Sequence, residues 1–480
     1  MGSEPPGQKS TCTSTTTSAI EESGMGVTLE PMANALSTDL YEITMAAGYV
    51  EAGLTDCASF ELTVRSLPPH RSYLIAAGLE PALEYLEKFS FTANEIRYLR
   101  GLGIFKNVAA KFFDETLPSL RFTGEVWAMP EGTPVFPHEP IVRVTAPLVE
   151  AQLVETALLS TISFQTSVAS RAARIVGAAG GRPVFEFGAR RAHGTDAGVL
   201  AARGAYVGGC GGTSMVEAGL RYGLPVTGTM AHSWVMCFET ETEAYERYMA
   251  LYGNQAVLLI DTYDSVTGID RIAKAGLRPG AVRIDSGDLL LESRLARSRL
   301  DATGCAETKI LVSGDLDEYR IAGLVSADAP IDGFGVGNAL STASDAPALG
   351  AVYKLVELER DGQTRPTLKL SEGKITYPGR KQVVRVPAES GSYSHDVIAL
   401  ADEDPSAAGH GLLERVMVDG RRARRGPELE SLQKRTHSEV ERLPGGVRDM
   451  QQSGQYSVRV SQTLDALLAD LTDALQNAEQ

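Results

Sequence analysis

The sequence predicts an α/β protein that combines a barrel of parallel strands with a second, β-rich α+β domain. Between residues 183 and 334, short apolar runs alternate with helical stretches, which is the pattern of parallel strands joined by crossover helices. Strand-like segments bounded by glycine and proline precede and follow this region. The 480 residues also exceed the usual size of a single hydrophobic core. We therefore expect the N- and C-terminal segments to build the β-rich domain beside a central barrel.

Four regions follow along the chain. Residues 1–35 are rich in Ser, Thr, Gly and Pro and lack the basic start and apolar stretch of a secretory signal, so they are predicted to form a disordered tail. Residues 36–150 are predicted to form the N-terminal α+β domain and residues 151–350 the catalytic barrel. Residues 351–480 are expected to return to the β-rich domain and to end in a helix.

The N-terminal domain is predicted to begin with a helix that Ser37, Thr38 or Asp39 caps and that runs through Tyr49. Polar and apolar residues alternate as in a strand over Phe60–Val64. The later elements are a helical region from Leu79 to about Leu117 and two short strands, Gly124–Ala128 and Ile141–Val144.

A long helical pattern from Leu148 to Val176 leads into the barrel. The predicted parallel strands are Pro183–Phe187, Leu224–Thr229, Ala256–Ile260, Ala281–Ile284, Lys309–Val312 and Ile331–Phe334. Three further strands are predicted at Tyr353–Leu358, Thr367–Leu370 and Gln382–Val386, followed by a polar, mostly surface segment over residues 401–454. Leucines at helical spacing over Ser461–Leu475 predict a last helix that docks on the domain.

Composition excludes several classes of protein. The hydrophobic content of 43% and charged content of 22% fit a globular protein, and the net charge of -16 argues against a nonspecific nucleic-acid binder. No apolar run approaches the roughly 20 residues of a membrane span. The five cysteines lack C-x-x-C spacing, which favours neither a zinc site nor disulfides and is typical of a reducing cytoplasm.

One histidine, His232, follows the apolar run that ends in Thr229. At the carboxyl end of a barrel strand, an imidazole can act as a base, a metal ligand or a phosphoryl acceptor. Asp261 directly follows four apolar residues of the next predicted strand, where a carboxylate can orient that imidazole. Taken alone, a structural hydrogen-bonding role explains such a histidine better, so the interpretation depends on the neighbouring strand ends.

Two of those strand ends are suited to a flat, anionic ligand. Phe187 can stack on a heteroaromatic ring, and Arg190 offers a planar fork to a carboxylate or phosphate, although a core ring and a surface arginine explain both equally well. The glycines of residues 208–212 let backbone N–H groups approach an anion, and Thr213 and Ser214 add hydroxyl donors. Close packing explains such a loop equally well.

Arg283 and Asp285 lie two residues apart on a predicted strand and so point to the same side. A cation and a carboxylate in a barrel mouth suit a ligand with an anionic group and hydroxyls, and a structural salt bridge is the alternative. The turns at Gly314-Asp315 and at Gly337-Asn338 stand at the last strands, the usual phosphate cradle of this architecture.

Together these residues resemble the nicotinate phosphoribosyltransferase family over residues 36–385. The order and spacing of several motifs carry the resemblance: Ser37-Thr38-Asp39-Leu40-Tyr41, Phe60 to Leu79, Glu186-Phe187-Gly188, Gly228-Thr229-Met230-Ala231-His232, Arg283 to Asp288, Phe334 to Gly337 and Tyr377 to Gln382. The resemblance implies an irregular α/β barrel of the type II phosphoribosyltransferase kind with a β-rich α+β domain. It also implies a homodimer with its active site at the subunit boundary.

The implied reaction joins nicotinate to phosphoribosyl pyrophosphate, gives nicotinate mononucleotide and pyrophosphate, and is coupled to ATP hydrolysis with Mg²⁺. By resemblance, His232 becomes phosphorylated and Asp261 is its carboxylate partner, and no residue is assigned as a metal ligand. The nicotinate contacts are Phe187, Ser214, Thr229, Arg283 and, from the other subunit, Tyr41. The phosphoribosyl pyrophosphate contacts are Arg190, Asp285, Gly314, Asp315, Gly337 and Asn338, the last being threonine in many relatives. Arg65, Lys354, Lys369 and Lys381 are expected to receive pyrophosphate or ATP phosphates.

The main alternative is a nicotinamide phosphoribosyltransferase. That relative places an aspartate in the glycine-rich loop to accept from the amide NH₂, whereas Ser214 stands there in this chain and can donate to a carboxylate. A quinolinate phosphoribosyltransferase would call for more cations at the barrel mouth and has no need of the phosphorylated histidine. A binding protein that has lost the activity would show decayed functional positions, which are intact in this sequence.

Overall fold

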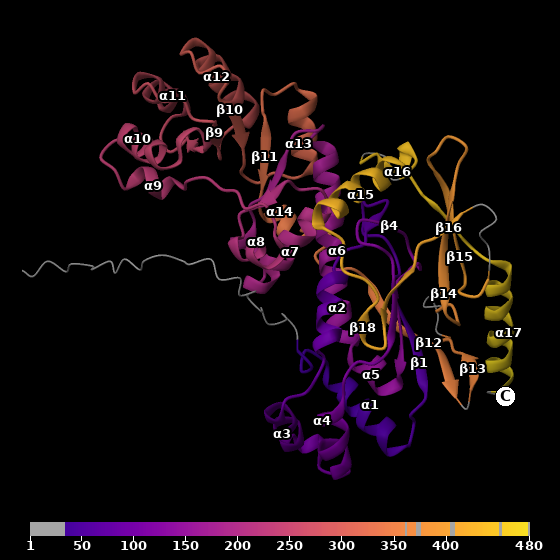
Figure 1. The fold of residues 1–480 in the computed structure, drawn as a ribbon. Helices are drawn as coiled ribbons and strands as arrows, with labels where there is room; N and C mark the ends of the chain where they lie inside the picture. The colour runs from indigo at the N-terminus through magenta and orange to yellow at the C-terminus, as the bar shows by residue number, and fades with distance from the viewer. Residues whose placement is uncertain (1–33, 361, 371–375, 404–408, 451–453, 479–480) are drawn as a thin grey trace, which may run out of the picture. The chain divides into compact units, whose positions relative to one another are not determined.

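The computed structural model of the chain describes residues 34–360, 362–370, 376–403, 409–450 and 454–478 (Figure 1). Apart from Asn34 and Ala35, the predicted disordered tail lies outside these residues. Among the helices that are described, none combines the length and the apolar character needed to cross a membrane.

An antiparallel sheet forms the β-rich part and joins both ends of the chain. Its strand order is β13-β12-β1-β5-β3-β17-β18. The bounds are β1 Cys57–Val64, β3 Glu125–Ala128, β5 Pro140–Pro147, β12 Ala351–Arg360, β13 Gln363–Pro366, β17 Glu414–Val418 and β18 Arg421–Arg422. The inner strand β1 pairs with β5 on one side and with β12 on the other. The predicted return of the C-terminal segment to the β-rich domain is therefore confirmed.

The helices of the N-terminal part largely follow the prediction. Helix α1 (Leu40–Glu51) begins after Asp39, but the Asp39 carboxylate accepts a hydrogen bond from Thr156 Oγ1 at 3.2 Å and does not cap the helix. The predicted helical region divides into α2 (Leu79–Lys88), α3 (Ala93–Gly101), a π-helical turn at Phe112–Thr116 and α4 (Leu117–Ser119). A two-stranded sheet of β2 (Leu74–Ile75) and β4 (Pro134–Val135) completes this part.

A six-stranded parallel sheet forms the other half of the fold, in the order β7-β6-β11-β10-β9-β8. The bounds are β6 Val184–Glu186, β7 Gly212–Thr213, β8 Val257–Leu259, β9 Ala281–Ile284, β10 Lys309–Val312 and β11 Gly333–Val336. Its crossover helices are α7 Thr195–Val207, α8 Val216–Tyr222, α9 His232–Met236, α10 Glu241–Tyr252, α11 Ser265–Lys274, α12 Leu289–Ala302 and α13 Glu318–Ser326, and the short α14 Asn338–Ser341 follows β11. This arrangement of parallel strands and helices is the half-barrel of the predicted α/β class.

Two strand predictions are wrong. Leu224–Thr229 forms no strand, because Pro225 lacks an N–H donor and only Val226 makes an isolated bridge, to Thr213. The edge position is taken instead by β7, which lies in the segment that the sequence predicts to be a glycine-rich loop. Thr367–Leu370 is likewise not a strand, since β13 ends just before it.

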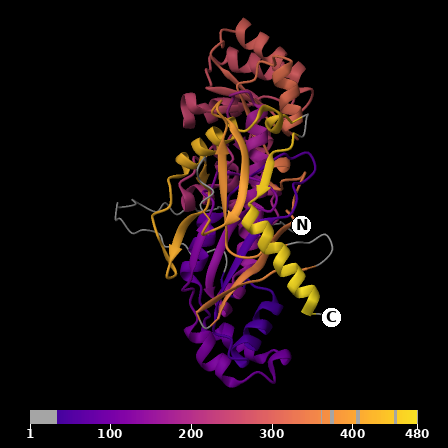
Figure 2. The same cartoon turned by 90° about the vertical axis from the view of Figure 1, so that its right-hand side faces the viewer.

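A second cluster of strands, in the order β16-β14-β15-β19, lies in the C-terminal segment. It is a mixed sheet, because β14 pairs antiparallel with β15 and β16 whereas β15 and β19 run parallel. Its strands are β14 Lys381–Pro387, β15 Tyr393–Leu400, β16 His410–Gly411 and β19 Ser457–Val460, and its helices are α15 Leu429–Glu441, α16 Gly445–Arg448 and α17 Gln462–Ala478. Helix α17 stands where the last helix is predicted and contacts β15, with Leu464 buried and Leu475 exposed (Figure 2). The segment 401–454 is less superficial than predicted, because α15 buries Leu432 and Thr436.

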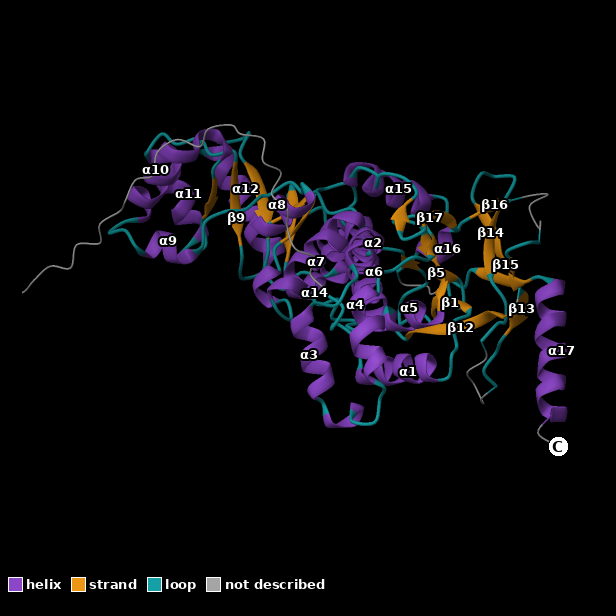
Figure 3. Cartoon of the chain, turned by 60° about the horizontal axis from the view of Figure 1, so that its bottom comes forward, coloured by secondary structure: helices purple, strands orange, loops and turns teal. Residues whose placement is uncertain are grey.

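Helix α6 (Glu155–Ala178) follows α5 (Leu148–Leu153) and belongs to both hydrophobic cores. Its first half, with Leu158 and Ile162, packs in the core of the large antiparallel sheet. Its second half, with Val168 and Ile175, packs in the core of the parallel sheet. Figure 3 shows α6 and α7 between the two groups of strands. The two halves of the fold therefore share one 24-residue helix, while the predicted domain boundaries remain predictions.

Candidate active site

A hollow of about 580 Å³ opens at the carboxyl ends of the parallel strands. It is called the strand-end hollow below. It brings together most of the predicted site residues, which come from the ends of β6, β7, β9, β10 and β11, from the segment before α9 and from the start of α9: Phe187, Arg190, Ser214, Thr229, His232, Arg283, Asp285, Gly314, Asp315, Gly337 and Asn338. The predicted convergence of strand ends is therefore found in the structure.

The Arg283 guanidinium is the hub of this hollow. Its Nε donates to Ser313 Oγ at 2.8 Å, and its Nη1 donates to Thr229 Oγ1 at 2.7 Å and to the Met230 carbonyl at 3.2 Å. Its Nη2 lies 2.8 Å from Asp285 Oδ1. Four of the five guanidinium N–H groups are thus engaged, which fixes the plane of the fork and leaves one donor on Nη2.

Asp285 is held in its ionised form. Burial alone would raise its pKa, but hydrogen bonds from Ser313 and Arg283, together with the nearby charge of Arg283 and then of His232, hold the pKa below its usual value. Ser313 Oγ and Arg283 both engage Oδ1. None of the residues described in the structure donates to Oδ2, so this oxygen can accept a hydroxyl group of a ligand.

His232 begins α9, and its Nδ1 lies 3.1 Å from Thr262 Oγ1. The expected hydrogen bond to Asp261 is not made. Asp261 Oδ2 instead accepts from the Asp285 backbone N–H at 2.9 Å and from Ser286 Oγ at 2.7 Å. Its Oδ1 is buried and receives no hydrogen bond from the described residues. The partner of the imidazole is the residue next to the predicted one, because Thr262 points a hydroxyl where the sequence pattern suggested a carboxylate.

Phe187 forms a flat platform at the end of β6. Its backbone N–H donates to the Val336 carbonyl at 2.8 Å, and its ring stacks on Phe185 with 6.3 Å between centroids and 17° between planes. The neighbouring strand β11 makes room for the Phe187 ring only because residue 335 is glycine. A Cβ at Gly335 would lie 2.5 Å from Phe187 Cδ2.

Glu186, for which no role is predicted, joins three segments of the site. Its carboxylate is fully buried and accepts from the Gly188 N–H at 2.5 Å, from Thr213 Oγ1 at 2.6 Å and from Ser341 Oγ at 2.6 Å. These donors belong to the Phe187 turn, the glycine-rich segment and α14. An acidic residue inside an apolar strand is a sequence signal that points to such a buried carboxylate.

The turn after β10 adopts a backbone that favours glycine. Gly314 has φ of +96°, and a Cβ there would lie 2.2 Å from the Asp285 carbonyl oxygen. Asp315 follows in the left-handed region with φ of 46° and keeps its side chain exposed in the hollow. The turn therefore places a second carboxylate near Asp285.

Tyr41 does not line the strand-end hollow. It lies on α1 with 46% of its surface exposed, and its phenol is hydrogen-bonded to Glu155. Partial burial and then the charge of Glu155 raise its pKa well above the usual value. The resemblance assigns Tyr41 to the site of a second subunit. Its position outside the hollow of its own chain does not test that assignment, which stays a prediction.

A second, smaller hollow of about 30 Å³ lies on the large antiparallel sheet and contains Arg65, Lys354 and Lys381. It is called the basic hollow below. Lys381 is buried there, and its Nζ donates to the Tyr377 and Gly379 carbonyls at 2.7 and 2.6 Å and lies 2.8 Å from Glu61 Oε2. All three ammonium N–H groups are used, so the predicted phosphate contact of Lys381 is replaced by a structural role.

The other two predicted phosphate contacts in this hollow have a neighbour that the sequence analysis missed. His138 lies beside Arg65 and Lys354, and burial and then the charge of Arg65 lower its pKa. Lys369 is exposed and does not line the basic hollow. Of the four predicted phosphate contacts, Arg65 and Lys354 therefore keep the geometry that the prediction requires.

Comparison with known proteins gives a consistent result. Residues 36–163 match the model of the N-terminal domain of nicotinate phosphoribosyltransferase. A nicotinate phosphoribosyltransferase of Mycobacterium tuberculosis is 46% identical over 448 residues, covering 92% of this chain and 94% of that protein. The enzyme of that name from Bacillus subtilis is 45% identical over 380 residues, covering 77% and 76%. The crystal structure of human nicotinic acid phosphoribosyltransferase superposes with a TM-score of 0.79 at 29% identity, covering 90% of this chain and 99% of that one.

Proposed function

This chain belongs to the nicotinate phosphoribosyltransferase family, and on that premise we propose that it joins nicotinate to phosphoribosyl pyrophosphate. The products are nicotinate mononucleotide and pyrophosphate, and the reaction is the first step in the salvage of NAD from nicotinate. The observation that carries the proposal is the strand-end hollow, in which an aromatic platform, a fixed guanidinium and two carboxylates line one cavity.

Nicotinate is a flat ring with one carboxylate, and the hollow has a counterpart for each. We place the pyridine ring on Phe187 and its carboxylate on the free Nη2 donor of Arg283, beside Thr229. Bonds to Ser313, Thr229 and Met230 hold the guanidinium before the ligand arrives, so little orientation entropy is lost on binding.

Phosphoribosyl pyrophosphate brings ribose hydroxyls and phosphates. The unengaged Oδ2 of Asp285 and the exposed carboxylate of Asp315 are suited to accept from the hydroxyls. The turn at Gly337-Asn338 and the Arg190 guanidinium are suited to the 5′-phosphate and its neighbours. Arg190 donates to the Phe187 carbonyl only at 3.3 Å, so its other donors can turn to a phosphate.

The chemical step needs no protein nucleophile. The pyridine nitrogen forms a bond to ribose C1 while the bond from C1 to the pyrophosphate oxygen breaks, and the electron pair leaves with pyrophosphate. The residues fit a magnesium ion carried by the substrate, because Asp285 and Asp315 offer the one or two carboxylates that such an ion takes beside phosphate oxygens. When bound, that ion would neutralise charge on the leaving group. The chain itself contributes orientation by Phe187 and Arg283 and stabilises positive charge at C1 through Asp285.

ATP coupling is proposed to pass through His232. The imidazole Nδ1 is engaged with Thr262, which leaves Nε2 as the phosphoryl acceptor. The γ-phosphoryl group of ATP would move to that nitrogen with release of ADP, and water would later release phosphate. A phosphoryl group at His232 adds negative charge within the strand-end hollow and can shift the populations of its cationic side chains.

We also propose a cytoplasmic homodimer in which Tyr41, Arg65 and Lys354 complete the site of the second subunit. In a single chain, Tyr41 is exposed on α1, and the two cations line the separate basic hollow. The four described cysteines, Cys57, Cys210, Cys237 and Cys305, are free thiols, as is usual in a reducing compartment. Nucleic acid is not an expected partner, because the net charge is -16.

Ser214 supports the acid over the amide as substrate. It lines the strand-end hollow and carries a hydroxyl that can donate to the nicotinate carboxylate. The Ser214→Asp variant is expected to lower nicotinate turnover and to gain nicotinamide turnover. Unchanged nicotinate turnover without any gain of amide turnover would contradict this discriminator.

The function is tested by mononucleotide formation from nicotinate, nicotinamide and quinolinate in parallel, with and without ATP. We expect product from nicotinate and stimulation by ATP. In the same experiment, γ-labelled ATP should leave an acid-labile label that His232→Ala abolishes. His437→Ala is the matched control, because His437 pairs with Glu441 outside the strand-end hollow and should keep the label. Product from nicotinamide or quinolinate alone would reject the proposal, and an unlabelled wild-type protein would reject the phosphohistidine.

A further inference from the structure

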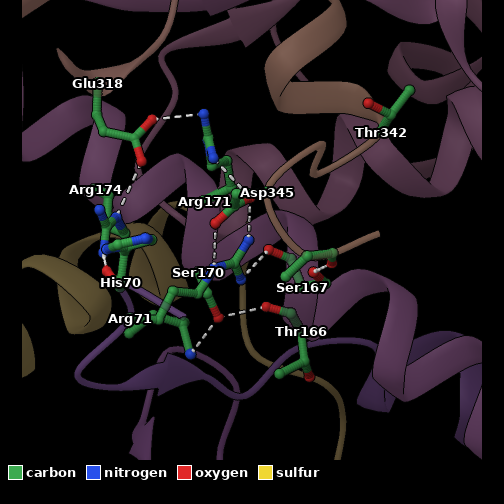
Figure 4. A network of polar contacts seen from close by, with 12 residues as sticks. His70, Arg71, Thr166, Ser167, Ser170, Arg171, Arg174, Glu318, Thr342 and Asp345 are labelled. Atoms are coloured by element: carbon green, nitrogen blue, oxygen red, sulfur yellow. Dashed lines mark hydrogen bonds and ion pairs between the residues drawn. The ribbon is translucent and has the colours of Figure 1, made fainter. Parts of the chain in front are cut away.

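A buried ion network connects α6 with the segments that follow β10 and α14 (Figure 4). It consists of Arg71, Arg171, Arg174, Glu318 and Asp345 and is called the arginine clamp below. The three arginine side chains and Glu318 are 7% exposed or less, and Asp345 is 22% exposed. Burying five charges carries a desolvation cost that their mutual pairing only partly offsets, so the clamp invites a functional explanation.

Arg171 is the member that joins the two carboxylates. It lies in the second half of α6, and its Nη2 is 2.7 Å from Glu318 Oε2 while its Nη1 is 2.7 Å from Asp345 Oδ1. A planar guanidinium can bridge two carboxylates at a fixed separation, which the single ammonium of a lysine cannot do with the same geometry. Arg171 therefore sets the distance between the two segments that carry these acids.

Those two segments follow the loops proposed to hold the phosphoribosyl group. Glu318 begins α13, three residues after Asp315. Asp345 comes four residues after α14, the helix that Gly337 and Asn338 begin. Each carboxylate thus stands at the base of one loop, and the clamp connects the bases.

The other two arginines anchor the same acids. Arg71 binds Asp345 through both Nε and Nη2 at 2.7 Å and donates through Nη1 to the Ser167 carbonyl at 3.0 Å. Arg174 donates through Nε to Glu318 at 3.2 Å and also donates to the His70 carbonyl. The loop bases are therefore fastened to α6, which spans both hydrophobic cores.

We propose that Arg171 is a positioning residue, which holds the ribose loop and the 5′-phosphate loop at the spacing that phosphoribosyl pyrophosphate requires. The inference rests on the proposed function of those loops. Arg171 does not line the strand-end hollow and so acts through Glu318 and Asp345 without contacting the substrate. A general electrostatic role is the competing explanation. Three cations and two carboxylates give the clamp a net positive charge, which could attract the phosphates of phosphoribosyl pyrophosphate at their proposed position.

The test compares Arg171→Gln with Arg171→Lys under steady-state conditions, varying phosphoribosyl pyrophosphate at saturating nicotinate and then the reverse. We expect Arg171→Gln to raise KM for phosphoribosyl pyrophosphate about tenfold, with KM for nicotinate changed less than about twofold. Arg171→Lys should give a KM for phosphoribosyl pyrophosphate between those of the wild type and Arg171→Gln, because lysine keeps the charge and loses the bridge. Should Arg171→Gln fail to fold, the lysine variant and Asp345→Asn carry the test.

Asp345→Asn separates positioning from electrostatics. Removing a carboxylate makes the clamp more positive, so a purely electrostatic clamp would lower KM for phosphoribosyl pyrophosphate, whereas a positioning clamp would raise it as Arg171→Gln does. Asp396→Asn is the control for lost stability, because it breaks the fully buried pair with Arg385 in the C-terminal cluster. The inference would be overturned if Arg171→Gln and Asp345→Asn, like the control Asp396→Asn, lowered Tm and left KM for phosphoribosyl pyrophosphate unchanged. Shifts of that KM in opposite directions for Asp345→Asn and Arg171→Gln would also overturn it. A wild-type enzyme that forms no mononucleotide would reject the proposed function instead.

Discussion

The strand-end hollow and the basic hollow both contain cations that the sequence singles out, yet these cations differ in the hydrogen-bond donors that they keep free for a ligand. Arg283 uses four of its five N–H donors on Ser313, Thr229, Met230 and Asp285, and keeps one for a ligand in a hollow of about 580 Å³. Lys381 uses all three donors within the protein, in a hollow of about 30 Å³. A cation is a binding residue only when donors and space remain after folding, and sequence alone reports neither.

The largest effect should come from Arg283. Replacing it by glutamine removes the oriented donor and leaves Asp285 without its cation, so we expect kcat/KM for nicotinate to fall about a thousandfold. Arg190→Gln is the matched variant in the same hollow and should cost about tenfold, because among the described residues Arg190 is held by a single long bond to the Phe187 carbonyl. Initial rates over a range of nicotinate concentrations measure both. Equal losses would mean that preorganisation of Arg283 does not matter.

Lys381 should affect stability. Lys381→Met leaves Glu61 buried without its ion-pair partner, so we expect the free energy of unfolding to fall by about 3 kcal/mol. The double variant Lys381→Met/Glu61→Gln should recover part of that loss. Lys354→Met, in the same basic hollow, should leave urea unfolding unchanged and lower the activity. A loss of activity in folded Lys381→Met that matches Lys354→Met would return Lys381 to the phosphate contacts.

The smallest effect should be on the acid dependence of stability. The pKa of Asp285 is lower in the folded protein than the usual value of about 3.9. Its contribution to stability is therefore present above about pH 4 and is lost as pH falls through the folded value. Asp285→Asn should be less stable than the wild type at pH 6, and the difference should shrink on acidification, as Tm between pH 3 and pH 6 will show. A difference that stays constant with pH would exclude this linkage.

Sequence reasoning placed the parallel strands best where local pattern and tertiary structure agree. Lys309–Val312 and Ala281–Ile284 are short segments of three apolar residues and one cation between turns, and both are strands with the predicted bounds. The run before His232 fails because Pro225 cannot donate to a ladder, so the histidine reaches the hollow from the start of α9. The position of the imidazole was predictable, but the element that carries it was not.

The functional details that escaped prediction all depend on contacts between distant segments. Thr262 partners His232, and Glu186 gathers hydroxyls from Thr213 and Ser341, which lies 155 residues away. The burial of Lys381 likewise follows from β1 supplying Glu61. Residue type and spacing identify which side chains can do chemistry, while the choice among possible partners is made only when the sheets assemble.

The pairing of β1 with both β5 and β12 has a consequence for how the protein is made. Residues 57–64 leave the ribosome almost three hundred residues before residues 351–360, so one edge of a nearly fully buried strand waits through the synthesis of the entire parallel half. An exposed apolar edge of this kind is a template for wrong pairing. A nascent chain stalled before residue 351 would thus present a natural binding site for chaperones at its N-terminal end.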